Sequence, residues 1–230
     1  MSEWSTYTLA DFLLFSPRTY YRLFELHHRA LWPLQLAALA AGALMLVLAA
    51  RGGRRAGGGA TAIAAAAWLW VAWSWQLERY ATINWAAGWI AAVFALEGLL
   101  LAGSSWATGS STHPAVHPVC RALGLGLVVY ALVLQPVAGL LAGRSWLGVE
   151  IFGITPAPTA VATLGLLLAR QPSFGLALVP LCFCLLDGAT LWAMAAPDAW
   201  VLPMIGLVAV SGFAIRRPRR KAQPAPGATC

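Results

Sequence analysis

The sequence predicts an all-α fold: a polytopic transmembrane bundle of about seven helices, preceded by a short helical segment at the membrane surface. The 230 residues are 60% hydrophobic and only 10% charged, whereas a soluble domain is nearer half apolar and a quarter charged. The apolar residues form long runs, and a run of about 20 residues crosses a hydrocarbon core about 30 Å thick. These Ala-, Leu- and Gly-rich runs lack the alternation of a transmembrane β-barrel.

Seven apolar runs between polar breaks mark the expected spans within a single bundle over residues 30–215. They cover residues 31–50, 60–77, 85–105, 122–142, 156–172, 174–194 and 201–215. The fifth and the seventh are the shortest. The second and third lie so close together that we expect a tight hairpin.

Residues 1–29 precede the first span and are expected to form an interfacial N-terminal helical segment. They lack the basic start, apolar core and cleavage site of a signal peptide, so we expect them to be retained. Ser16-Pro17 is typical of a helix start, with Ser as N-cap. The aromatic side of the following helix, with Tyr20 and Phe24, is expected in the lipid or on the bundle. Adjacent side chains on a helix diverge, so His27-His28 indicates interfacial or packed residues rather than a metal site.

Basic residues predict the orientation of the seven spans. Ten fall on one side, namely Arg51, Arg54, Arg55, Arg121, Arg170, Arg216, Arg217, Arg219, Arg220 and Lys221. Five fall on the other, namely Arg18, Arg22, Arg29, Arg79 and Arg144. Because basic loops stay in the cytoplasm, we expect the N-terminus outside and the C-terminus inside, with residues 216–230 as a disordered cytoplasmic tail. This charge suits anionic lipids, and nucleic acid is not an expected partner.

Two acids fall inside predicted spans. Glu97 lies near the middle of the third span and Asp187 in the outer half of the sixth. An ionisable group in hydrocarbon is costly unless it is paired or faces water. The pair is therefore interpreted either as a proton or cation site or as neutral groups that hold helices together by hydrogen bonds. Gln135 is a third polar residue within a span.

Two further segments contribute candidate residues in the outer half of the bundle. The hairpin between the second and third spans carries Glu78, Arg79, Tyr80 and Asn84. At the fifth span, two prolines at positions 156 and 158 predict a broken or extended stretch, with a helix beginning near Pro158. Thr155 and Thr159 supply hydroxyl groups there. Interrupted helices often frame substrate or ion sites in transporters, although prolines also occur at ordinary helix starts.

No motif predicts a cofactor, a metal or a catalytic residue. His113 and His117 are separated by a proline and lack further ligands, and Cys182 and Cys184 lie within a span, where packing explains them. The chain has no Ser-His-Asp signature, no H-E-x-x-H and no phosphate loop.

Three stretches resemble a family of bacterial multi-pass membrane proteins of unknown function, some of whose members are assigned as permeases. They are FSPRTYYRLFELHHRALWPLQ at 15–35, YATINWAA at 80–87 and FGITPAPTAVATLGLLL at 152–168. The family pattern has Cys between the two prolines of the third stretch, where this chain has Ala157. His27-His28 stands in place of an aromatic-amide pair. The resemblance implies a bacterial inner-membrane location and supplies no established activity.

The leading hypothesis is an inner-membrane protein that moves or binds a small solute or ion within its bundle. The alternative is a structural, sensing or accessory membrane subunit, and a membrane enzyme is less favoured because no acid–base or metal cluster is evident. Ala- and Gly-rich faces such as residues 37–44 allow close helix contacts. A homo-oligomer or a partner membrane subunit therefore fits the sequence.

Overall fold

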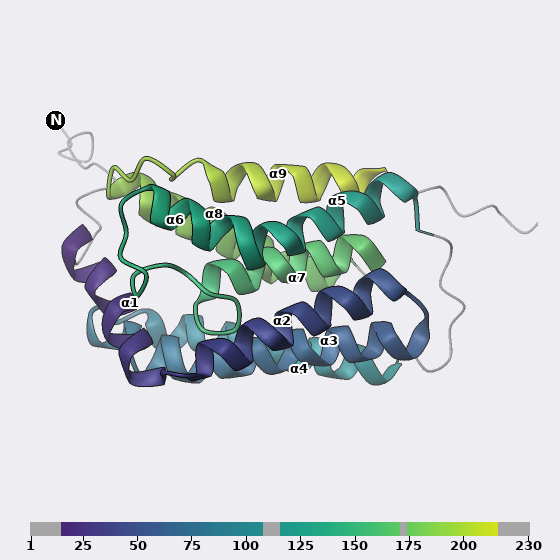
Figure 1. Ribbon diagram of the computed structural model, residues 1–230, viewed down its shortest axis with the longest axis horizontal. Helices are drawn as coiled ribbons and strands as arrows, with labels where there is room; N and C mark the ends of the chain where they lie inside the picture. Colours follow the sequence, from purple (N-terminus) through teal and green to yellow (C-terminus); the bar gives the residue numbers. More distant parts are fainter. Residues whose placement is uncertain (1–14, 108–115, 171–173, 216–230) are drawn as a thin grey trace, which may run out of the picture.

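The structure is a computed structural model that describes residues 15–107, 116–170 and 174–215, and within these ranges every regular element is a helix (Figure 1). The longer helices are α1 (Pro17–Leu31), α2 (Leu34–Arg51), α3 (Arg54–Val71), α4 (Ala87–Ala107), α5 (Pro118–Val129), α7 (Pro156–Arg170), α8 (Leu178–Ala193) and α9 (Val201–Ala214). Shorter pieces are η3 (Ala72–Leu77), η4 (Tyr80–Thr82), η5 (Tyr130–Leu134), α6 (Gln135–Leu141) and η6 (Phe174–Ala177).

Each of the seven predicted apolar runs coincides with one helical stretch. Five stretches are long and apolar enough to cross a membrane, namely Leu34–Arg51, Arg54–Thr82, Ala87–Trp106, Pro118–Leu141 and Phe174–Ala193. The two shortest runs form α7, with 15 residues, and α9, with 14 residues. The all-helical architecture is confirmed, with five candidate spans by length and composition.

Helix α7 is the centre of the bundle. All its residues from Pro156 to Ala169 are buried, and α2, α3, α5, α8 and α9 pack around it (Figure 1). The closest approach is to α5, where a Cβ atom added to Gly124 would lie 2.5 Å from the carbonyl oxygen of Gly165. Only glycine allows two helix backbones to meet so closely. The part of FGITPAPTAVATLGLLL from Pro156 onward is therefore a core helix enclosed by its neighbours.

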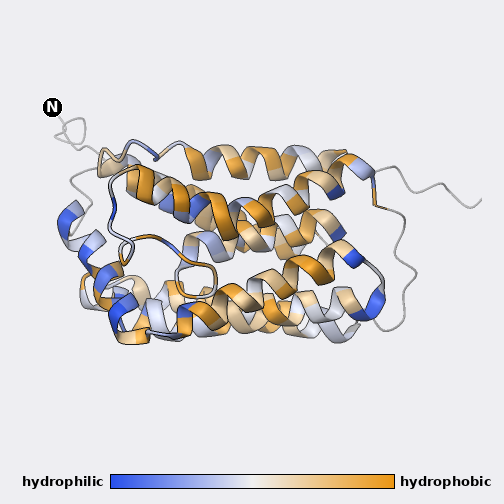
Figure 2. Cartoon of the chain, viewed as in Figure 1, coloured by the Kyte–Doolittle hydropathy of each residue, from blue (hydrophilic) through white to orange (hydrophobic). Residues whose placement is uncertain are grey.

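The outer surface along the helices is apolar, whereas the polar residues gather at the two ends of the bundle (Figure 2). Leu36, Leu99, Val133, Leu186 and Leu207 are examples of large apolar side chains that remain exposed. A water-soluble protein rarely leaves so large an apolar surface uncovered. This distribution is the one that a bundle in a hydrocarbon layer requires.

Prolines shape two helices of the bundle. The predicted start of α7 near Pro158 was wrong, because the helix begins at Pro156. The N–H groups of a first turn have no intrahelical acceptor, so both prolines fit there without losing a hydrogen bond. In the fourth stretch, Pro136 cannot donate to the carbonyl of Leu132, and the π-helical turn η5 precedes it.

The two ends of the bundle differ in construction. At the end that we call the α1 end, α1 lies across the bundle, next to the turn after η3 and the loop between α6 and α7 (Figure 1). At the opposite end, which we call the arginine end, Arg51 closes α2, Arg54 and Arg55 open α3, Arg121 lies in the first turn of α5 and Arg170 closes α7.

Candidate functional site

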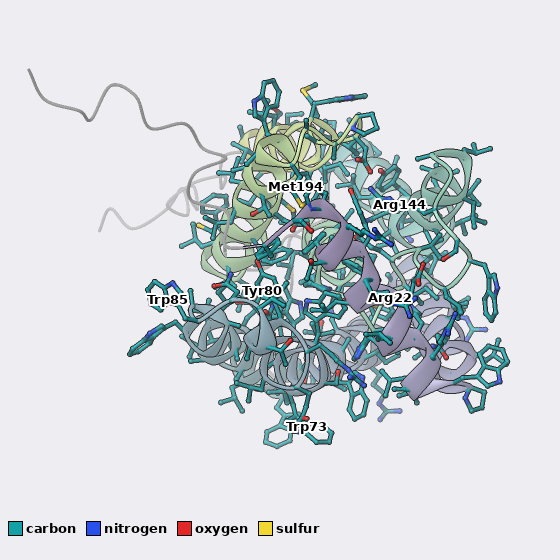
Figure 3. All side chains as sticks on the ribbon, turned by 90° about the vertical axis from the view of Figure 1, so that its left-hand side faces the viewer. Arg22, Trp73, Tyr80, Trp85, Arg144 and Met194 are labelled. Carbon is teal, nitrogen blue, oxygen red and sulfur yellow. The ribbon has the colours of Figure 1, made fainter. Side chains whose placement is uncertain are left out.

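Helix α1 runs across the α1 end of the bundle (Figure 3). Ser16 is its N-cap, as the sequence predicts, and the Ser16 hydroxyl accepts a hydrogen bond of 3.2 Å from the Thr19 N–H. Tyr20 and Phe24 are buried, and the Phe24 ring lies 4.4 Å from that of Trp75 in η3. Of the two placements expected for the aromatic side, the structure has the one on the bundle. The helix runs two residues beyond the predicted limit at residue 29.

The loop between α6 and α7 turns into the bundle before α7 begins. Gly143 (φ +81°) and Gly153 (φ +71°) adopt left-handed backbone conformations that favour glycine. The Thr155 hydroxyl accepts a hydrogen bond of 3.0 Å from the Ile151 N–H, and the Thr159 hydroxyl accepts one of 2.9 Å from the Gly153 N–H. These bonds hold the segment 149–155 against the start of α7, with Glu150 inside.

Arg144, at the beginning of this loop, is the centre of an ionic cluster. Its guanidinium donates a hydrogen bond of 2.7 Å to Asp198 and lies 3.6 Å from the Glu150 carboxylate. It also stacks on the Tyr21 ring, with 4.7 Å between its Cζ atom and the ring centroid. One helix, one loop and the start of the α9 region thus meet at a single guanidinium.

Glu150 is the most enclosed charged group of the loop, with a relative exposure of 6%. The Gln135 amide donates a hydrogen bond of 2.9 Å to its second carboxyl oxygen. Burial raises the pKa of Glu150, while the Arg144 guanidinium acts in the opposite direction. The net shift is upward, so this carboxyl takes up a proton more readily than a solvated glutamate does.

Asp187 in α8 joins the same region from the other side. Its carboxylate accepts a hydrogen bond of 3.2 Å from the Tyr20 hydroxyl of α1. Glu150, Arg144 and Asp198 are close enough to act on it electrostatically. We call Arg144, Glu150, Asp187, Asp198, Gln135 and Tyr20 the Arg144 cluster. It brings three carboxyl groups together with a single guanidinium.

Two cavities adjoin Arg144. The inner one, of about 50 Å³, is lined among others by Tyr130, Gln135, Glu150 and Asp198. The outer one, of about 360 Å³, is open to the surface and is lined among others by Tyr21, Glu25, Ser145 and Pro197. Arg144 lines both cavities.

The inner cavity offers hydrogen-bond acceptors. In the described part of the chain, the Gln135 carbonyl oxygen and one Asp198 carboxyl oxygen are buried without a partner. A buried acceptor without a donor costs free energy. By the usual measure of about 10–15 Å³ for each water, the cavity holds a few water molecules. It is therefore suited to protons, waters or a small hydrogen-bond-donating cation rather than to a large solute.

The predicted hairpin residues lie at the edge of this region. Tyr80 packs edge-on against Tyr20, with 6.4 Å between ring centroids, and is close enough to Asp187 to feel its charge. Asn84 caps the turn, because its side-chain oxygen accepts a hydrogen bond of 2.9 Å from the Ala86 N–H. Glu78 is exposed and Arg79 is half-buried. Of these four, Tyr80 comes nearest to the Arg144 cluster.

The threonines and Glu97 have different surroundings. Thr155 and Thr159 are fully buried, and each hydroxyl donates to the carbonyl four residues earlier while it accepts from the loop. Glu97 is fully buried in α4, and neither of its carboxyl oxygens has a hydrogen-bond partner among the described residues. The charged groups that act on Asp187 belong to the Arg144 cluster and do not include Glu97. The structure thus separates the two acids that the sequence suggested as a pair.

The sequence pattern does not mark Glu150, Asp198 or Tyr20 as site residues, and Arg144 contributes there only to the predicted orientation. The signal that could have identified Glu150 is its place as a lone acid in the apolar stretch VEIFGI, shortly before the prolines of α7. Nothing in the local pattern of Asp198 distinguishes it from an ordinary loop residue.

His27 and His28 are residues of α1 and are buried, each with a relative exposure of 1%. His28 Nδ1 lies 2.8 Å from the Phe24 carbonyl oxygen. Burial lowers the pKa of His27 to about 4, and His28 and Arg79 add to this effect. An interaction with the Ile154 backbone acts in the opposite direction and raises the pKa of His27, although its geometry is not that of a normal hydrogen bond. Of the two placements expected for these histidines, interfacial or packed, the structure has the packed one, and His27 is neutral at pH 7.

The fold and the cluster define a class: an all-helical bundle with an apolar outer surface, a central enclosed helix and a buried ionic cluster under a helix at one end. The chain belongs to a family of unknown function (DUF6064), whose model matches residues 18–223. The predicted resemblance to a family of unknown function is thus confirmed as far as membership of such a family is concerned. No curated protein and no solved structure matches the chain.

Proposed function

We propose that the protein is a bacterial inner-membrane protein that binds and moves a proton or a small cation at the Arg144 cluster. In this proposal all seven helical stretches span the bilayer, with the N-terminus outside and the C-terminus inside. The α1 end then faces outward, and α1 lies at the membrane surface over the site.

The observation that carries the proposal is an excess of carboxyl groups, two of them buried and one half-buried, beside an accessible cavity. Glu150, Asp187 and Asp198 share one guanidinium, so the cluster carries a net negative charge unless a proton or a cation joins it. Two unpaired acceptors in the inner cavity favour the same kind of ligand. The open cavity that Arg144 also lines supplies a route from the surface.

Reconstitution into liposomes tests this function. With an internal pH dye and a panel of monovalent cations, we expect the wild type to dissipate an imposed gradient and Glu150→Gln to reduce the flux at least about tenfold. Glu78→Gln is the matched control, because Glu78 is an exposed acid at the same end. Absence of flux in the wild type would contradict transport, and equal flux in both variants would exclude Glu150 from the path.

The orientation has its own test. Cys230 ends the predicted cytoplasmic tail. An impermeant maleimide should label Cys230 in inverted inner-membrane vesicles and leave it unlabelled in intact spheroplasts. Labelling in spheroplasts would reverse the proposed topology.

A second candidate function is a sensing or accessory membrane subunit that transports nothing. It is favoured by the enclosed packing of α7 and by the internal hydrogen bonds of Thr155 and Thr159. Co-purification of a partner from detergent-solubilised membranes, together with absent flux, would favour this candidate over the first.

A further inference from the structure

The arginine end of the bundle carries positive charge that no acid of the described chain balances. Arg121 donates to the Ala50 carbonyl, and Arg170 donates to the Gly57 carbonyl. Arg54 and Arg55 are exposed, and they form no ion pair or hydrogen bond within the described residues. Apart from Glu97 in the middle of α4, the described acids all lie at the α1 end: Glu25, Glu78, Glu150, Asp187 and Asp198.

The two unpaired arginines border a cavity. It has a volume of about 350 Å³ and lies between the first turns of α3 and the last turn of α4. The small residues Gly58, Gly59, Ala62 and Ser105 form part of its lining, and Arg54, Arg55 and Trp106 complete it. The hollow exists because glycines and alanine leave the start of α3 without bulky side chains. A cavity of this size falls in the range of small-ligand sites.

The lining suits an anionic ligand such as a phosphate group. Guanidinium groups match phosphate oxygens with pairs of charge-assisted hydrogen bonds. An anion in this cavity would meet two guanidinium groups and no carboxylate of the described chain. Free Arg side chains at the entrance of a preformed hollow thus distinguish this site from a merely basic surface.

Trp106 and the neighbouring surface of α4 point to a lipid as the source of the phosphate. Trp106 is 85% exposed, and tryptophan is enriched where a protein meets the headgroup layer. Leu96 and Leu99, ten and seven residues before it, lie along the same side of α4 and are also exposed. An acyl chain can lie along this apolar stripe while its headgroup occupies the cavity.

We infer that the cavity between the start of α3 and the end of α4 binds the phosphate of an anionic phospholipid, held by Arg54 and Arg55 with Trp106 at the headgroup level. This site lies at the end of the bundle opposite the Arg144 cluster. It needs no ion transport, so it does not depend on the outcome of the flux experiment.

Native mass spectrometry of the delipidated, detergent-solubilised protein tests the site. Phosphatidylglycerol is titrated against phosphatidylcholine with the same acyl chains. We expect a preference for phosphatidylglycerol in the wild type, and a loss of affinity of at least about tenfold in Arg54→Gln/Arg55→Gln. Arg51→Gln is the matched control, because Arg51 is an exposed arginine at the same end outside the cavity lining. We expect its affinity to stay within about twofold of the wild type.

A shape variant separates the cavity from its charge. Gly58→Leu fills the hollow and keeps both arginines, and we expect the same loss of phosphatidylglycerol, with thermal unfolding used to verify the fold. If Arg51→Gln weakened the binding of phosphatidylglycerol as much as the double variant, diffuse positive charge would explain the binding and the proposal would be overturned. The absence of any preference for phosphatidylglycerol over phosphatidylcholine would also overturn it. Binding of inorganic phosphate as tight as that of the lipid would overturn the lipid assignment.

Discussion

The two ends of the bundle handle charge in opposite ways. At the α1 end, the carboxyl groups of Glu150 and Asp187 are buried and that of Asp198 is half-buried, and each of the three is tied to a tyrosine, an amide or Arg144. At the arginine end, Arg54 and Arg55 stay exposed and unpaired within the described chain. A buried charge must be paired because desolvation is costly, whereas an exposed one retains its water. The first end therefore depends on its charges for stability, and the second keeps them available for a ligand.

The largest expected effect comes from removing the guanidinium of the α1 end. Arg144→Met leaves Glu150 and Asp198 without their cation, and we expect a loss of about 3–5 kcal/mol in the free energy of unfolding, as for other broken buried pairs. Thermal or denaturant unfolding in detergent measures it. The control is Arg22→Met, which removes an exposed pair with Glu25 and should cost less than about 1 kcal/mol. Similar small losses in both variants would refute the difference between buried and exposed charge.

The next-largest expected effect is the pH dependence of the free energy of unfolding, which arises from His27 at the α1 end. The pKa of His27 is lowered to about 4 in the folded protein, so below about 6.5 protons bind preferentially to the unfolded state. The stability present above pH 6.5 should fall as the pH drops towards 4, by up to about 3 kcal/mol.

The variant His27→Gln isolates the contribution of His27 to the pH dependence of stability. Burial raises the pKa of Glu150, so its titration acts in the opposite direction as the pH falls. The free energy of unfolding is measured against pH for the wild type and for His27→Gln. Because Glu150 is present in both proteins, its contribution cancels when the two curves are subtracted. A difference that stays flat between pH 4 and 6.5 would show that His27 does not have the lowered pKa.

At the arginine end, Arg170→Gln should have a smaller effect. The side chain donates to the Gly57 carbonyl and to the Thr61 hydroxyl, which join α7 to α3. We expect a loss of about 1.5–3 kcal/mol, the usual range for hydrogen bonds that involve a charged group. Unfolding in detergent measures it, and a loss as large as that of Arg144→Met would erase the contrast between the two ends.

The smallest effect on stability belongs to the exposed arginines. Arg54→Gln and Arg55→Gln should change the free energy of unfolding by no more than about 0.5 kcal/mol, because substitutions of unpaired surface residues rarely do more. Unfolding of the lipid-free protein is the appropriate measurement. A substantial loss without lipid would indicate a structural role for these side chains in place of a ligand-binding one.

Much of the architecture was predictable because hydropathy acts locally. The seven runs coincide with helical stretches, and Ser16 caps α1 as expected. The start of α7 was predicted two residues too late for a local reason. Proline is disfavoured in the interior of a helix but is tolerated in its first turn. The candidate site was harder to predict. Asp187 belongs to the Arg144 cluster and Tyr80 lies near it, whereas Glu97 is apart from it.

The sequence by itself determined the helical class, the positions of the helices and the gathering of basic residues in one set of loops, because each depends on residues close together in the chain. Only the tertiary structure decided which polar groups meet. Glu150 is reached by Gln135, 15 residues earlier, and Asp187 by Tyr20, 167 residues away. A short loop folded back inside the bundle and a helix laid across its end make these contacts, and they depend on packing between helices rather than on local pattern.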